Sequence, residues 1–365
     1  MNLFGAPIPA PTAEHLAIAK ISVVILSLLF VPYISILSGT VLFSLGFVYR
    51  GHKEERPFFL RFARDLVNTF IHWGSGIVLG ILPVFTLMVC FAQILWGSEV
   101  AITRFFTWTL VFIAAAVILA QFYKKTFAAG EEESYLQYFL GLATLGALTL
   151  GGFAFVSTVT VATFPEKWPL ITTFIPLTYD WNMLARFTHF TVAGLAMTGA
   201  AIVFFFINWM GGKEDLDAEY REYVRKFGGG VALGFGILQT LFYLWYLGTL
   251  PEFAKSWSVY HIGIAGIATL LLVSYLLYAL LSKANTGLGV PVFILFLVFF
   301  FLVSYGENQA RENALVYQNY ALAKKAAEIE AEIEARRAEK APGGGETADI
   351  AKGEEIYNTR CIACH

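Results

Sequence analysis

The stretch Ser258-Val-Tyr-His-Ile-Gly-Ile-Ala-Gly-Ile-Ala-Thr-Leu-Leu-Leu-Val-Ser-Tyr-Leu-Leu-Tyr-Ala-Leu-Leu-Ser282 contains no Asp, Glu, Lys or Arg. As a helix it is long enough to cross the ~30 Å hydrocarbon core of a bilayer. Across the 365 residues, 57% are hydrophobic and only 14% charged, far from the composition of a soluble domain. The sequence therefore predicts an all-α, polytopic membrane helix bundle with about eight transmembrane helices, at 17–48, 66–96, 103–123, 136–163, 183–210, 228–250, 258–282 and 289–305.

The distribution of Lys and Arg predicts how the bundle is oriented. Twelve of these residues fall in the loops after the first, third, fifth and seventh runs, and four fall in the opposite loops. Cytoplasmic loops carry the excess of positive charge. We therefore expect a multi-pass protein of the bacterial cytoplasmic (inner) membrane, with both the N- and C-termini on the periplasmic side. No basic stretch indicates nucleic acid.

The last five residues, Cys361-Ile-Ala-Cys-His365, match the attachment signature of haem c. In this signature Cys361 and Cys364 form thioethers with the haem, and His365 ligates the iron. A zinc site is the alternative, but Cys90 is the only other cysteine, so no second thiol pair completes a tetrahedron. The preceding Gly353-Glu-Glu-Ile-Tyr357 resembles the first helix of class I cytochromes c. Haem c is attached outside the cytoplasmic membrane, in agreement with the charge distribution.

Three domains follow from the composition. Residues 1–305 form the membrane bundle. Residues 306–342 are rich in Ala, Glu, Lys and Arg, which predicts a charged extracytoplasmic helical arm. Residues 343–365 are a Gly-rich linker and the start of a cytochrome c domain. The arm either carries a mobile haem domain or packs against a partner subunit.

Two histidines lie inside apolar runs, where an ionisable side chain indicates a functional site. His189 is about two turns into the fifth run from its outer end, and His261 is about one turn into the seventh. At similar depth, the two imidazoles could ligate one haem b iron. Alternatively, each makes separate helix-to-helix hydrogen bonds.

The remaining histidines are weaker candidates. His72 is better explained as a hydrogen-bonded residue of the second run, and His52 as a solvated loop residue. His15, with Lys20 one turn further in, is either interfacial or a ligand of a further haem. The sequence does not decide whether His15, Lys20 or His72 ligates anything.

Four stretches resemble the larger, haem-bearing subunit of the cytochrome bd oxidase superfamily, in their order and spacing. They are Leu29-Phe-Val-Pro32, the run from Asp65 to Gly80, Arg186-Phe-Thr-His189, and Ser304-Tyr-Gly-Glu-Asn-Gln309. The resemblance covers residues 15–313. It implies that His189 ligates a low-spin haem b and that a second, bd-like membrane subunit accompanies this chain.

The chain departs from that family at the residues that reduce oxygen. Ser27 stands where the family has the histidine of its high-spin haem, and Thr103 and Val111 stand where it has two glutamates. Ile262 matches a methionine ligand, with His261 beside it, so we expect a bis-histidine haem. The quinol-binding loop is reduced to about residues 251–257.

The expected function is a b- and c-type cytochrome subunit of a respiratory complex. It would pass electrons between haem b near the outer face and the attached haem c, with other c-type cytochromes as partners and possible further haem in partner subunits. Whether the chain is itself an enzyme is left open. One alternative is a divergent bd-like terminal oxidase fed by cytochrome c. A third is a membrane anchor for cytochrome c, and secondary transport is disfavoured because the apolar runs hold few charges.

Overall fold

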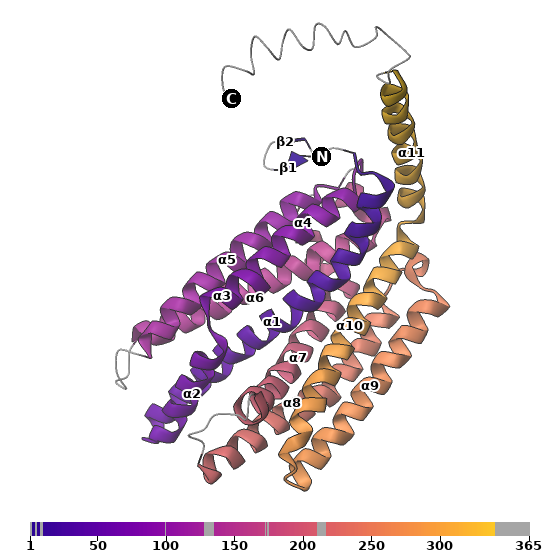
Figure 1. The fold of residues 1–365 in the computed structure, drawn as a ribbon. Coiled ribbons are helices and arrows are strands. Elements are labelled where there is room, and N and C mark those ends of the chain that lie inside the picture. The colour runs from indigo at the N-terminus through magenta and orange to yellow at the C-terminus, as the bar shows by residue number, and fades with distance from the viewer. Residues whose placement is uncertain are drawn as a thin grey trace, which may run out of the picture.

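Eight membrane-length helices lie side by side in an elongated bundle in the computed structural model (Figure 1). The structure describes residues 10–98, 100–127, 135–171, 173, 175–209 and 217–338 in full, and the backbone alone of 2–3, 6–7 and 339. The expected all-α, multi-pass membrane fold is confirmed. The spans are α1 (Ala13–Lys53), α3 to α4 (Trp73–Ile94), α5 (Ile102–Thr126), α6 (Tyr135–Thr163), α7 with η4 (Trp181–Asn208), α8 (Ala218–Gly248), α9 (Trp257–Ser282) and η7 with α10 (Thr286–Ala314).

Short elements complete the described chain. The second span is built from α3 (Trp73–Ser75), the π-helix η1 (Gly76–Ile81) and α4 (Leu82–Ile94), and a second π-helix, η4 (Phe204–Asn208), ends the fifth. Short 3₁₀ helices lie in the connections: η2 (Pro165–Leu170), η3 (Ile175–Tyr179), η6 (Glu252–Ala254) and η7 (Thr286–Leu288). The two-residue strands β1 (Asn2–Leu3) and β2 (Ala6–Pro7) pair antiparallel.

The second span begins later than the sequence predicts. Residues 57–70 form a separate helix, α2 (Pro57–Phe70), whose buried residues follow one face. The backbone is then extended at Ile71 and His72, and the Nζ of Lys124 donates to the carbonyl of Ile71 at 2.7 Å. The expected start at residue 66 is therefore wrong, because an amphipathic helix precedes the break and the membrane run starts at Trp73.

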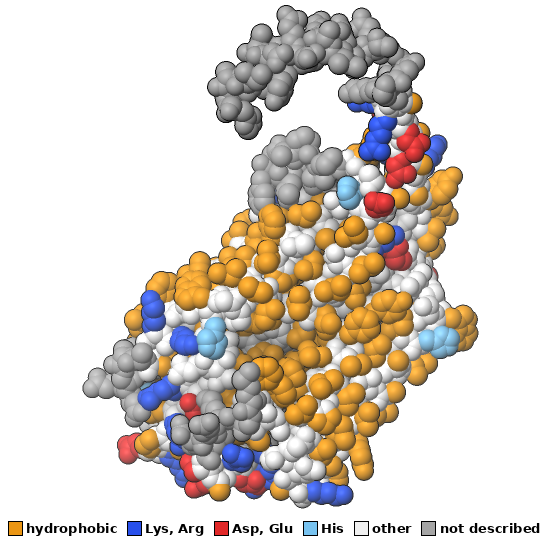
Figure 2. Space-filling view, viewed as in Figure 1, with side chains coloured by type: hydrophobic (Ala, Val, Ile, Leu, Met, Phe, Trp, Pro, Cys, Tyr) orange, Lys and Arg blue, Asp and Glu red, His pale blue; other side chains and the backbone are white. Residues whose placement is uncertain are grey.

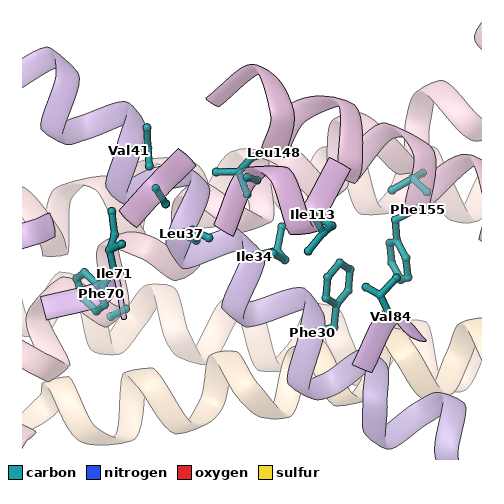
Figure 3. Packing of buried hydrophobic residues seen from close by; sticks show 14 of the residues in the cluster. Phe30, Ile34, Leu37, Val41, Phe70, Ile71, Val84, Ile113, Leu148 and Phe155 are labelled. Atoms are coloured by element: carbon teal, nitrogen blue, oxygen red, sulfur yellow. The ribbon is translucent and has the colours of Figure 1, made fainter. Parts of the chain in front are cut away.

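Helix α1 lies at the centre of one half of the bundle and contacts α2, α4, α6, α7 and α10. Its residues Phe30, Ile34, Leu37 and Val41 recur at the helical spacing and point into a shared core with α5 and α6 (Figure 3). Phe30 meets Phe155 edge to face, with ring centroids 4.8 Å apart. In a bilayer such interdigitation holds helices together by dispersion, since lipid is as apolar as leucine.

Helices α7 and α8 approach most closely where both carry glycine. A Cβ on Gly199 would lie 2.5 Å from the backbone nitrogen of Ala232 and 2.6 Å from the carbonyl oxygen of Gly228. Only a residue without a side chain allows the two backbones to touch in this way. This contact fixes the position of α7, and therefore of His189, against α8.

A final helix, α11 (Val316–Glu339), extends from the end of α10 beyond the bundle (Figure 1). Its 24 residues span about 36 Å. The side-chain amide of Gln318 donates to the carbonyl of Trp96 at 3.0 Å, and the amide of Ala13 donates to Glu330 at 3.4 Å. The start of α1 and the arm therefore lie at the same end of the bundle, as eight spans require.

Candidate functional site

His189 of α7 is buried inside the bundle, with only 5% of its surface exposed. Its ring packs near Tyr243 and Tyr246 of α8, with centroids 5.1 and 6.4 Å away, and edge-on to Phe299 of α10 at 6.0 Å. Its Nε2 is buried and has no hydrogen-bond partner among the described residues. A buried imidazole nitrogen without a partner costs free energy unless something else binds it.

His189 lines a cavity between α1, α6, α7 and α10. The walls are mainly apolar, with Val31, Phe155 and Phe300 among them, and the cavity volume is about 50 Å³. Ser27, which the resemblance matches to a histidine of the bd superfamily, also lines this cavity. Besides Ser27 and His189, the polar residues of its lining are Arg186, Ser304 and Glu307.

Arg186, one helical turn from His189, is buried and contacts three other helices, although its Nε makes no hydrogen bond to the described residues. Its guanidinium lies 3.4 Å from the carboxylate of Glu307, donates to the Tyr246 hydroxyl at 2.9 Å, and donates to the Thr160 hydroxyl at 3.3 Å. It also lies 4.9 Å from the centre of the Tyr246 ring. Helices α6, α7, α8 and α10 are thus joined by one side chain.

A second buried arginine extends this cluster along α10. Arg311 is 1% exposed, lies over the ring of Phe91 at 4.8 Å, and interacts electrostatically with Glu312 and Glu307. Glu312 in turn pairs with Lys20 of α1 at 2.5 Å. We call Lys20, Arg186, Glu307, Arg311 and Glu312 the outer charge cluster. It holds three cations and two carboxylates, an excess of one positive charge.

His261 does not face His189 in this structure. It is exposed on α9, with its ring stacked on Trp257 at 6.0 Å, on the same side as the exposed Ile264. The inner side of α9 at this level carries Gly263 and Ile262, and the latter packs against Gly306 of α10. In this structure the two imidazoles therefore do not meet, because His261 lies roughly 200° around α9 from the buried Gly263 and roughly 140° from the buried Gly266. That both imidazoles ligate one iron stays a prediction.

The other histidines also lie at surfaces. His15 is exposed in the first turn of α1, where its backbone amide is capped by Thr12, and Lys20 is paired with Glu312 instead of facing a cofactor. His72 is exposed at the break before α3, so the expectation of a buried, hydrogen-bonded histidine is wrong. Partial burial and the nearby Lys124 ammonium lower the pKa of His72 below its usual range.

The residues expected to hold haem c, Cys361, Cys364 and His365, lie outside the described residues, as does the domain 343–365. Val111, matched to one family glutamate, is exposed on α5. Thr103 lies in the first turn of α5. Neither of these two positions carries an acid.

Haem b fits this site in its chemistry, and the cavity is small for it. The unpartnered nitrogen of His189 suits an iron, and the apolar walls suit the haem macrocycle. The guanidinium of Arg186 suits the haem carboxylates. A volume of about 50 Å³ holds one or two waters, whereas ligand cavities usually measure several hundred. A haem would therefore enter only if the side chains that line the cavity moved apart.

No family model matches the chain, and no curated protein matches it.

Sequence reasoning missed most of the outer charge cluster. In the sequence, Arg186 and Glu307 belong to two short motifs, and the composition places Glu307, Arg311 and Glu312 in the predicted arm of residues 306–342. The available signal was helical spacing: Glu307 and Arg311 are four apart, directly after an apolar run. Charges at that position must be paired or face the interior of the bundle.

Proposed function

We propose that the chain is a b- and c-type cytochrome subunit of a membrane respiratory complex. In this proposal His189 ligates haem b inside the bundle, and Cys361, Cys364 and His365 hold haem c at the end of the arm. Haem supplies one-electron redox chemistry, and the protein sets where it lies and at what potential. A second membrane subunit of bd-like type and other c-type cytochromes are the proposed partners, in a bacterial inner membrane with both termini periplasmic.

The observation that carries the haem b proposal is the buried Nε2 of His189. An unpaired imidazole nitrogen at the wall of an apolar cavity is unfavourable in a chain without a ligand, and an iron ligand removes the cost. His189 is 5% exposed, so Nε2 is closed off from the surface, and a water inside the cavity is the alternative partner to the iron. His189 is also the histidine that the family motif Arg186-Phe-Thr-His189 assigns to haem.

The outer charge cluster supports the same proposal. Its three cations and two carboxylates leave one positive charge over, at the polar end of the His189 cavity. Haem b carries two propionate carboxylates, and Arg186 and Arg311 are the described cations that could pair with them. Such pairing would orient the macrocycle with its polar edge toward the arm.

One observation favours the alternative, a divergent terminal oxidase. Among the described residues that line the cavity, His189 is the only histidine and no methionine is present. A haem held by His189 alone has an open coordination position, which oxygen or carbon monoxide can occupy. The choice between the oxidase and the electron-transfer subunit therefore depends on whether the haem iron has a sixth ligand from the protein.

The deciding experiment is a pyridine haemochrome assay and a reduced-minus-oxidised spectrum of the purified full chain, with and without carbon monoxide. The variants are His189→Ala, Cys361→Ala with Cys364→Ala, and, as a matched control, His52→Ala in the last turn of α1. We expect haem b to be lost in the first, covalent haem c in the second, and neither in the third.

Three results would change the conclusion. If the parent protein contains covalent haem and no haem b, the bundle is a membrane anchor for cytochrome c. Haem b retained at full content in His189→Ala rules out His189 as its essential ligand. A carbon monoxide shift in the parent protein favours the oxidase over the electron-transfer subunit.

A further inference from the structure

A second hollow lies toward the other end of the bundle, away from the outer charge cluster. It opens between α1, η1, η4 and α10 and has a volume of about 330 Å³, within the range of small-molecule sites. Figure 2 shows that hydrophobic side chains cover the middle of this face, whereas charged side chains gather toward its two ends. Leu29 lines the hollow and is 43% exposed, so the site opens toward the lipid.

The hollow is bounded by both π-helices of the described chain. Leu79 of η1 and Phe205 of η4 each contribute to its wall. A π-helical turn is rare and occurs frequently at functional sites. Two such turns at one hollow are therefore an independent indication that it binds something.

Two glycines of η1 leave room for the side chain of Tyr33 at the polar end of the hollow. A Cβ on Gly80 would lie 3.2 Å from the ring of Tyr33, and one on Gly76 would lie 3.5 Å from its hydroxyl. The Tyr33 side chain reaches Ser75 by a hydrogen bond, and Ser75 itself donates to the carbonyl of His72 at 3.1 Å. Because Ser75 gives its only hydrogen to His72, the Tyr33 hydroxyl donates to Ser75 while the hollow is empty, and it would exchange this hydrogen bond for one to a ligand in the hollow.

His72 supplies a second neutral donor. It lines the hollow, and its side chain makes no hydrogen bond to the helix that it begins. The lowered pKa keeps the imidazole neutral at pH 7, with one N–H to donate. None of the described lining residues is Asp, Glu, Lys or Arg.

These features select the ligand. The donors are neutral, which suits carbonyl oxygens, whereas a phospholipid phosphate or a fatty acid would need a cation in the wall. Aromatic residues, Phe70, Phe205 and Phe293, suit a flat ring. The opening toward lipid suits a long apolar tail. We propose that this hollow binds the headgroup of a lipid-soluble quinone, with Tyr33 and His72 donating to its carbonyl oxygens.

The proposal goes beyond the haem sites and can be tested whatever haem the chain holds. Met197 lines the quinone hollow, and Ala193, one turn along α7, lines the His189 cavity. These two residues lie about 6 Å apart along the helix axis, so α7 contributes to the walls of both sites. A quinone in this place would be a natural electron partner of the bundle.

The test is photolabelling of the full chain in lipid nanodiscs with an azidobenzoquinone and an azidonaphthoquinone, each carrying a decyl tail. Labelled peptides are mapped by mass spectrometry, and half-saturation gives the affinity. We expect saturable labelling within residues 28–37 or 69–79, displaced by unlabelled quinone. Leu29→Trp, which plugs the hollow from the lipid side, should weaken it at least tenfold.

The matched control is Ile25→Trp, one turn away on the same exposed side of α1 and outside the hollow, which should label as the parent does. Tyr33→Phe with His72→Leu removes both donors and should weaken affinity roughly tenfold. This pair also decides the matter if Leu29→Trp does not fold. Two results would overturn the proposal and show a lipid-filled groove. One is displacement of the label by phosphatidylglycerol as effectively as by quinone, and the other is unchanged labelling in all variants.

Discussion

A charged residue inside a membrane bundle has to be paired, and Arg186 shows how far one residue can tie a fold together. It is bonded to Glu307, Tyr246 and Thr160, which come from three different helices. Its side chain is 4% exposed, so the surrounding dielectric is low and the loss of one partner leaves a charge or a hydroxyl without compensation. The same residue lies beside His189.

We expect Arg186→Ala to destabilise the protein strongly, by about 3–5 kcal/mol, since Glu307 loses its partner inside the bundle. Thermal unfolding in detergent, followed by intrinsic fluorescence, measures the effect. Arg336→Ala is the matched control. It breaks the exposed Arg336–Glu332 pair of α11 and should change stability by less than about 1 kcal/mol. Equal shifts in the two variants would contradict a buried role for Arg186.

His261 is the residue at which sequence and structure disagree most. Its outward position predicts that His261→Ala leaves the content and visible spectrum of haem b unchanged, while His189→Ala abolishes them. The measurement is the reduced-minus-oxidised spectrum of both variants. If His261→Ala instead turns a low-spin haem into a high-spin, carbon-monoxide-binding one, α9 must rotate in the haem-loaded protein and the bis-histidine haem is restored.

At the level of elements, the contact between α7 and α8 depends on glycine. Gly199→Ala places a Cβ about 2.5 Å from the backbone of α8, which neither helix can relieve without moving. We expect a loss of roughly 1–3 kcal/mol in stability, together with reduced haem b, because α7 carries His189. The control is Gly230→Ala on α8, where a Cβ meets nothing within 4 Å. That variant should be neutral or more stable by up to about 1 kcal/mol.

Element boundaries show what the sequence could and could not reveal. The apolar runs gave eight spans, because length and the absence of charge determine membrane crossing almost alone. They missed the break at Ile71 and His72, since α2 is apolar on one face and its run merges with the next span. A carbonyl held by Lys124 fixes that break, and such a contact between distant residues has no local signal.

The candidate site divides in the same way. His189 could be singled out, because a histidine in an apolar run is rare and expensive. The sequence could not show which side of α9 His261 occupies, because α9 is apolar all round and only packing decides its rotation. The outer charge cluster needed α1, α7 and α10 to be placed together, since its pairs join residues such as Lys20 and Glu312, which are 292 positions apart.

At the scale of the whole molecule, the arm and the start of α1 occupy one end of the bundle, and the basic residues near α2 and α5 occupy the other (Figure 2). Trp73, Lys124 and Lys125 line a hollow at that second end, beside Arg64. Clusters of Lys and Arg at the end of a bundle favour the cytoplasmic leaflet, whose lipids are anionic. The arm would then project into the periplasm, where haem c is attached.

This orientation predicts the outcome of thiol labelling in spheroplasts. Tyr317, at the start of α11, is 87% exposed, so Tyr317→Cys places an accessible thiol on the arm. Lys283→Cys places one in the loop between α9 and α10. A membrane-impermeant maleimide should modify the first thiol in intact spheroplasts and the second only after permeabilisation. Cys90 is buried and should remain unlabelled in both. The reverse pattern would put the arm in the cytoplasm, where haem c is not attached, and would remove the covalent haem from the proposed function while leaving His189 as a ligand for haem b.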